Sequence, residues 1–142
     1  MDQIKFNHQF PIQIRFVDID AFGHVNNAVF ASYYETARVA YFDEVLGLRI
    51  NWKKNGLILA KNILEYKLPV YLRDTIICKT AVSKLGNKSI EICNLLVRIK
   101  NEKEEIVASA NGILVCYDYE SNTTIEIPED WRMLIKSKEN II

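Results

Sequence analysis

The sequence predicts an α+β fold in which an antiparallel sheet of five to six strands curls around one long helix. A single long helical pattern lies early in the chain, and the strand patterns after it are joined by tight turns, which is the element order of an α+β arrangement. The helical segment is apolar around most of its circumference. Because such a helix is usually buried on several sides, we expect the sheet to wrap around it.

The helix is predicted from about Asn27 to Val45. Asn26 or Asn27 is a suitable N-cap, and Gly47 supplies a residue that can close the helix in a left-handed conformation. Apolar residues recur at steps of three and four, the spacing that puts side chains on one helical face: Phe30, Tyr34, Ala37, Tyr41 and Val45.

A first strand is predicted before the helix, because Ile12, Ile14 and Phe16 alternate with polar residues. This strand would deliver Asp18 and Asp20 to the start of the helix. Further strands are expected over 57–68, 75–85, 89–100 and 106–119, followed by a short helix over 129–136.

The strand over 89–100 leaves two readings open. Ile90 and Ile92 share one face, whereas Leu95, Val97 and Ile99 share the other. Either a bulge near Cys93-Asn94 shifts the alternation, or both faces of this strand are covered.

Composition excludes several classes of function. The chain has 142 residues, of which 49% are hydrophobic, and this predicts one domain over residues 1–142. Eighteen basic and eighteen acidic side chains cancel, so no global field would attract nucleic acid or an anionic membrane. No apolar run approaches the length of a membrane span. We therefore expect a soluble, cytoplasmic protein.

The cysteine and histidine spacings do not predict a metal site. Cys78, Cys93 and Cys116 fall inside predicted strands without a paired spacing, so we interpret them as reduced core residues. His8 and His24 lie 16 positions apart with no thiol nearby, which argues against zinc. We expect neither a metal nor a cofactor.

The residues from Val17 to Asn27 carry the chemistry. They hold two carboxylates, an imidazole, a glycine and two amides directly before the helix. The first N–H groups of a helix have no internal partner and favour negative charge, and Gly23 lets a ligand approach the backbone closely. A carboxylate opposite such donors is the arrangement that acyl transfer needs.

This stretch resembles the signature of the hotdog-fold thioesterases of the 4-hydroxybenzoyl-CoA thioesterase type and their acyl-carrier-protein thioesterase relatives. The resemblance covers nearly the whole chain, and its motif reads Asp18-x-Asp20-x-x-Gly23-His24-Val25-Asn26-Asn27, then Tyr33-Tyr34-Glu35-x-Ala37-Arg38. It implies a hotdog fold of five to six strands around the helix. In the plant members an Asn follows the Asp by two residues, and Phe22 stands there in this chain.

The resemblance also implies roles for individual residues. The second Asp of the family's pair is the catalytic carboxylate and matches Asp20, while amides at the helix start polarise the thioester carbonyl. Lys88 matches a family position near the nucleotide of coenzyme A. The candidate catalytic residues are therefore Asp20, His24 and Asn27, and the candidate substrate-binding residues are Gly23, Val25, Asn26, Lys88 and Ser89.

The predicted reaction is hydrolysis of an acyl thioester of coenzyme A or an acyl carrier protein, with Asp20 as general base or nucleophile. A non-catalytic module that binds acyl thioesters on the same fold is the alternative, and a hotdog dehydratase ranks third. A curled sheet leaves an edge that a second subunit can pair with. We therefore expect a homodimer, with a tetramer possible, and neither nucleic acid nor membrane insertion as a partner.

Overall fold

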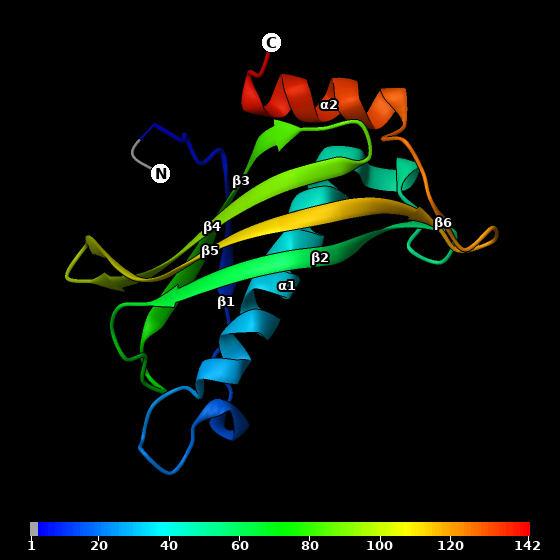
Figure 1. Cartoon of the computed structure of the whole chain (residues 1–142). Coiled ribbons are helices and arrows are strands. Elements are labelled where there is room, and N and C mark those ends of the chain that lie inside the picture. The colour runs from blue at the N-terminus through cyan, green and yellow to red at the C-terminus, as the bar shows by residue number, and fades with distance from the viewer. Residues whose placement is uncertain (1–2) are drawn as a thin grey trace.

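The computed structural model describes residues 3–142, and in them one curled antiparallel sheet wraps around a long helix, α1 (Figure 1). The strand order is β1-β3-β4-β5-β2, with β6 beside β5. This confirms the predicted fold class and strand number. The elements are β1 (His8–Ile12), η1 (Phe16–Asp18), α1 (Asn27–Leu46), η2 (Gly47–Arg49), β2 (Asn55–Tyr66), β3 (Thr75–Leu85), β4 (Ser89–Lys100), β5 (Lys103–Asp118), β6 (Thr123–Thr124) and α2 (Glu129–Glu139).

One side of helix α1 is buried along its length in two apolar clusters. Phe30, Tyr34 and Ala37 belong to the cluster around the first half of the helix. Tyr41 and Phe42 belong to the second, which also contains side chains of α2. The sheet therefore covers this side of α1, as predicted, whereas the opposite side carries exposed residues such as Ala28, Ala31 and Val39.

The first strand ends earlier than its alternation predicts. β1 stops at Ile12, and the chain then turns into a 3₁₀ helix in which Phe16 is 82% exposed. The backbone N–H of Arg15 donates to the Asp18 carboxylate over 2.9 Å, which stabilises this turn. The prediction of a strand through Phe16 is wrong because this local side-chain hydrogen bond competes with strand pairing.

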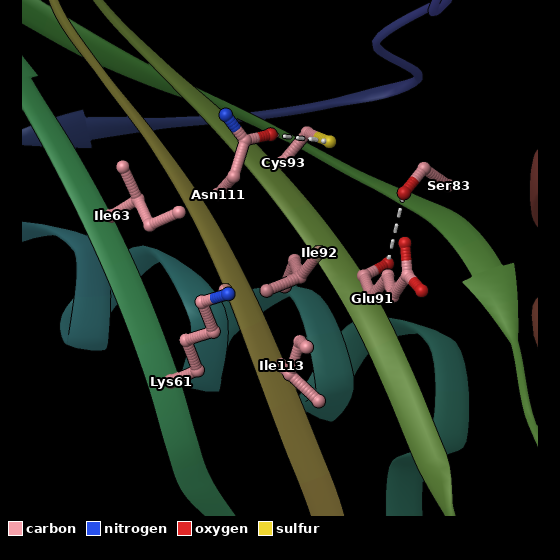
Figure 2. Close-up of a pocket in the computed structure, with 9 residues that line it drawn as sticks. Lys61, Ile63, Ser83, Glu91, Ile92, Cys93, Asn111 and Ile113 are labelled. Atoms are coloured by element: carbon pink, nitrogen blue, oxygen red, sulfur yellow. Dashed lines mark hydrogen bonds between the residues drawn. The ribbon is translucent and has the colours of Figure 1, made fainter.

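Both faces of β4 carry buried residues, Ile92 on one and Cys93 and Val97 on the other, as the second reading predicts, and the prediction of a bulge near Cys93-Asn94 is wrong. Pairing is regular there, and the register shifts lie at Val82/Lys84 and Leu96/Val97. Figure 2 shows the outer face, where the Cys93 thiol donates to Asn111 Oδ1 over 3.2 Å beside a hollow of about 170 Å³. All three cysteines are free and buried.

The loops and turns gather at two opposite ends of the molecule (Figure 1). At one end lie the loop before α1 and the β2–β3 loop, joined by the hydrogen bond from Val25 N–H to the Val70 carbonyl, 2.8 Å. At the other lie the β3–β4 turn and α2, joined by Arg132 Nη2 to the Gly86 carbonyl, 2.8 Å. Within residues 3–142, no helix has the length and apolarity needed to cross a membrane.

Candidate functional site

The loop that precedes α1 folds into a tight hairpin tip. The Asp20 N–H donates to the His24 carbonyl over 3.1 Å, and the Gly23 N–H donates to the Asp20 carbonyl over 3.0 Å. Gly23 has a φ of +86°, a conformation that side chains disfavour. Glycine at this position therefore allows the chain to reverse within five residues.

Asp20 lies half-buried at the base of this tip. Its Oδ1 accepts the Phe22 N–H over 2.9 Å, and its Oδ2 lies 3.4 Å from Asn26 Nδ2. Both partners are neutral and belong to the same loop. The carboxylate is thus oriented without being neutralised, which leaves oxygen lone pairs available to a ligand or water.

Asp18 has a different environment from Asp20, although only one residue separates them. It is 1% exposed, and its carboxylate accepts hydrogen bonds from the Arg15 N–H, the Arg15 guanidinium and the Tyr33 hydroxyl, the last over 2.7 Å. Burial alone would raise the pKa of Asp18, but these hydrogen bonds and the Arg15 charge lower it below its ordinary value. Asp18 therefore anchors the loop to α1.

The start of α1 leaves the first backbone donor of the helix open. Asn26 is the N-cap: its Oδ1 accepts the Ala28 N–H over 2.9 Å, and its carbonyl accepts the Val29 N–H over 2.9 Å. Among the described residues we find no acceptor for the N–H of Asn27. That donor lies where the helix dipole is most positive, so it is suited to a developing oxyanion.

A cavity of about 320 Å³ opens beside this donor. Tyr66 on β2 forms one wall and donates its hydroxyl to the Asn27 carbonyl over 3.1 Å. His24 also lines the cavity and stacks on Phe22, with ring centroids 6.3 Å apart. The full lining is His24, Val25, Asn27, Phe30, Tyr66, Lys67, Leu68 and Pro69.

The structure brings most of the predicted site residues together, since Asp20 and the run Gly23 to Asn27 share one loop. It does not bring Lys88 and Ser89 to that loop within one chain. They lie in and after the β3–β4 turn, where Lys88 Nζ contacts Thr124 Oγ1 at 3.3 Å. Eleven residues of β3 separate the two ends, roughly 33 Å of extended chain.

Sequence reasoning missed the roles of Tyr33, Tyr66 and Arg38. Tyr33 holds Asp18, Tyr66 walls the cavity, and Arg38 is a buried cation in α1. Tyr33 and Arg38 did offer a signal, since both belong to the motif Tyr33-Tyr34-Glu35-x-Ala37-Arg38, whereas Tyr66 offered none. Among the residues that the structure describes, no three His, Cys, Asp or Glu side chains form a group that could hold a metal.

The known proteins that this chain resembles in sequence are thioesterases. The sequence model of the thioesterase-like superfamily matches residues 14–135. Among curated proteins, an acyl-acyl carrier protein thioesterase of Arabidopsis thaliana chloroplasts is 29% identical over 114 residues, which are 78% of this chain and 59% of that protein. The chain thus spans little more than half the length of this relative.

Solved structures agree with the observed fold. A thioesterase of Thermus thermophilus, crystallised with coenzyme A and zinc, is 29% identical and superposes with a TM-score of 0.80 over 96% of this chain and 97% of that one. A 4-hydroxybenzoyl-CoA thioesterase mutant, crystallised with 4-hydroxybenzoyl-CoA, is 19% identical and gives a TM-score of 0.83 over 90% and 97%. The latter likeness supports the fold alone.

Proposed function

Because the chain belongs to the thioesterase-like superfamily, we propose that it hydrolyses an acyl thioester, of coenzyme A or of an acyl carrier protein, to a free acid and a thiol. The observation that carries this proposal is that one short loop before α1 holds both a carboxylate without an ion pair among the described residues, Asp20, and an open helix-start N–H, that of Asn27. A group that attacks or activates water and a donor for the oxyanion are the two parts that this reaction needs.

In the proposed mechanism, Asp20 either takes a proton from water as the water oxygen bonds to the thioester carbon, or attacks that carbon itself. In both routes the carbonyl oxygen becomes an oxyanion, which the Asn27 N–H stabilises, a contribution of about 3–4 kcal/mol to the transition state for one such donor. In the first route the carbon–sulfur bond then breaks and the thiolate takes up the proton held by Asp20. In the second route the thiolate leaves a mixed anhydride with Asp20, and water hydrolyses this anhydride to the free acid and the Asp20 carboxylate while one of its protons goes to the thiolate. His24 and Tyr66 bound the cavity that receives the carbonyl group.

We propose that the active form is a homodimer or a multiple of it. Edge strand β2 pairs only with β5, is twelve residues long and exposes Ile58, Leu59 and Ile63. The opposite edge strand, β1, has five residues and contains Pro11, which has no N–H to donate. The β2 edge is therefore the better surface for a second copy. A solution mass near 16.5 kDa at micromolar protein would contradict this.

The reaction can be tested by mixing the protein with a panel of acyl-CoA esters, and acyl carrier protein thioesters, in the presence of a thiol-detecting reagent. We expect thiol release well above the spontaneous rate with at least one class. Saturable binding of these thioesters without thiol release would instead identify a non-catalytic binding module.

A further inference from the structure

A second cavity lies beside the middle of α1 and contains a buried charge. It has a volume of about 200 Å³, and Arg38 within it is 9% exposed. Trp52 is held at its wall because the indole N–H donates to Asp43 Oδ1 over 3.1 Å. The residues that line this Arg38 pocket are Glu35, Arg38, Val39, Phe42, Trp52 and Leu57.

The guanidinium of Arg38 lacks a close acceptor. Its only ion pair among the described residues is with Glu35, at 4.0 Å, and the Glu35 side chain is 73% exposed. Burial lowers the pKa of Arg38 despite that carboxylate. A guanidinium carries five donors, and burying it without hydrogen bonds is costly. The pocket therefore presents a mostly buried guanidinium, with no close protein acceptor among the described residues, to whatever enters between its otherwise mostly apolar walls.

The Arg38 pocket and the Asp20 loop lie at different positions along α1 of the same chain. Asn27 and Arg38 are eleven residues apart on α1, about 16 Å along the helix. Leu57, in the pocket, is near the start of β2, whereas Tyr66, beside the Asp20 loop, ends β2. The two sites thus mark opposite ends of the free edge strand.

Two-fold pairing through β2 would bring these ends together. When a strand pairs antiparallel with its own copy, the first residues of one strand lie beside the last residues of the other. The start of β2, with its Arg38 pocket, would then lie next to the Tyr66 end and Asp20 loop of the second copy. The same symmetry moves the Lys88 turn of one chain toward the Asp20 loop of its partner.

We propose that the Arg38 pocket holds the far end of the acyl group whose thioester lies at the Asp20 loop of the partner subunit, and that it selects acyl groups bearing an oxygen acceptor there. Arginine suits this role because its planar donors bind carboxylate, hydroxyl or carbonyl oxygens directionally. Val39, Phe42 and Trp52 would pack against the carbon skeleton. This inference rests on the proposed hydrolase activity and on the proposed dimer.

The first experiment compares kcat/KM for pairs of acyl-CoA esters of equal length, with and without an oxygen at the far end: adipoyl against hexanoyl, sebacoyl against decanoyl, and 4-hydroxybenzoyl against benzoyl. We expect the oxygenated member of at least one pair to be preferred by about tenfold or more, because a site built to hydrogen-bond an oxygen rejects the analogue lacking it. Hydrolysis without preference in any pair would overturn the inference while leaving the proposed activity intact. Absence of hydrolysis with every thioester would overturn both.

Variants then assign the preference to Arg38. Arg38→Met should remove most of the preference through KM for the oxygenated substrate, with Arg38→Lys retaining part of it. Arg49→Met is the matched control, since Arg49 is an exposed arginine outside the pocket, and it should keep the wild-type ratio. An unchanged ratio in folded Arg38→Met would refute the role of Arg38.

A mixed dimer tests whether the pocket acts across the interface. Chains carrying Asp20→Asn and chains carrying Arg38→Met are co-expressed with different tags, and the mixed species is isolated. Its only site with an intact Asp20 belongs to the Arg38→Met chain, and only the partner can supply Arg38 to it. Wild-type preference at about half the wild-type rate supports the inference, whereas loss of the preference places the pocket in the same chain as its Asp20 and overturns it.

Discussion

Replacing each of two neighbouring carboxylates should separate folding from catalysis. In Asp18→Asn, one buried oxygen that accepts charged and neutral donors becomes an amide nitrogen facing those donors. Loss of a charge-assisted hydrogen bond and burial of an unsatisfied donor together cost about 2–4 kcal/mol. For a chain of this size the melting temperature should fall by roughly 5–15 °C.

Asp20→Asn should show the reverse pattern. The asparagine oxygen can still accept the Phe22 N–H, and the contact that is lost is the long, exposed one from Asn26 Nδ2, so the free energy of unfolding should change by less than about 1 kcal/mol. Removing the general base or nucleophile should lower kcat about 100-fold or more, equivalent to a barrier increase of about 3 kcal/mol.

Both effects can be measured on the same samples by thermal melts followed by circular dichroism and by steady-state hydrolysis of one accepted thioester. The assay temperature must lie below the melting transition of Asp18→Asn, so that its kinetics report on folded protein. Near wild-type turnover by Asp20→Asn would refute the proposed mechanism. A larger catalytic loss in folded Asp18→Asn would assign the working carboxylate to Asp18 instead.

Two further outcomes follow from the structure. Burial lowers the pKa of His8 below 6.5, with Glu44 and Glu139 opposing the shift and Lys138 adding to it. As the pH falls, the unfolded chain therefore binds a proton at this histidine before the folded protein does. The melting temperature should be highest above pH 6.5 and fall below that pH, and the fall should be smaller in His8→Gln. Gly23→Ala should lower kcat by straining the Asp20 loop, since its φ is +86° with nothing within 4 Å of an added Cβ. Gly47→Ala, also at positive φ in open space but at the other end of α1, should lower stability without the kinetic loss. Equal kcat losses in the two variants would contradict the assignment.

The parts of the fold that depend on local patterns could be predicted from the sequence. The helix from Asn27, its Asn26 cap and the strands over 75–85 and 89–100 match the observed bounds, because periodicity and turn residues determine them. The alternation of Ile12, Ile14 and Phe16 gave a wrong prediction of a strand, because the hydrogen bond of the Asp18 carboxylate stabilises a 3₁₀ turn there. Whether the 3₁₀ turn or the strand forms depends on where Asp18 is buried, and the burial of Asp18 cannot be predicted from a short sequence pattern.

Part of the candidate site could likewise be predicted from the sequence, and part could not. Asp20 and the residues from Gly23 to Asn27 are contiguous, so a motif can identify them together. The cavity walls Tyr66 and Lys67 come from the end of β2, and their proximity to Asn27 arises only from sheet curvature. When residues of a site come from elements that are distant in the sequence, no short motif contains them, so a motif cannot predict that they lie together.

The half-exposed position of Asp20 gives the dimer a chemical purpose beyond protecting a strand edge. Hydrogen bonds and charges stabilise a developing oxyanion most strongly where water is excluded. Within one chain the Asp20 carboxylate is oriented but only half-buried, and it does not line the cavity beside the Asn27 N–H. A second copy paired through β2 would place the start of its own β2 against this loop and exclude water from it. The proposed assembly would therefore supply the low-dielectric surroundings that the catalytic groups of a single chain lack, and dissociation of the dimer should abolish turnover even if each protomer remains folded.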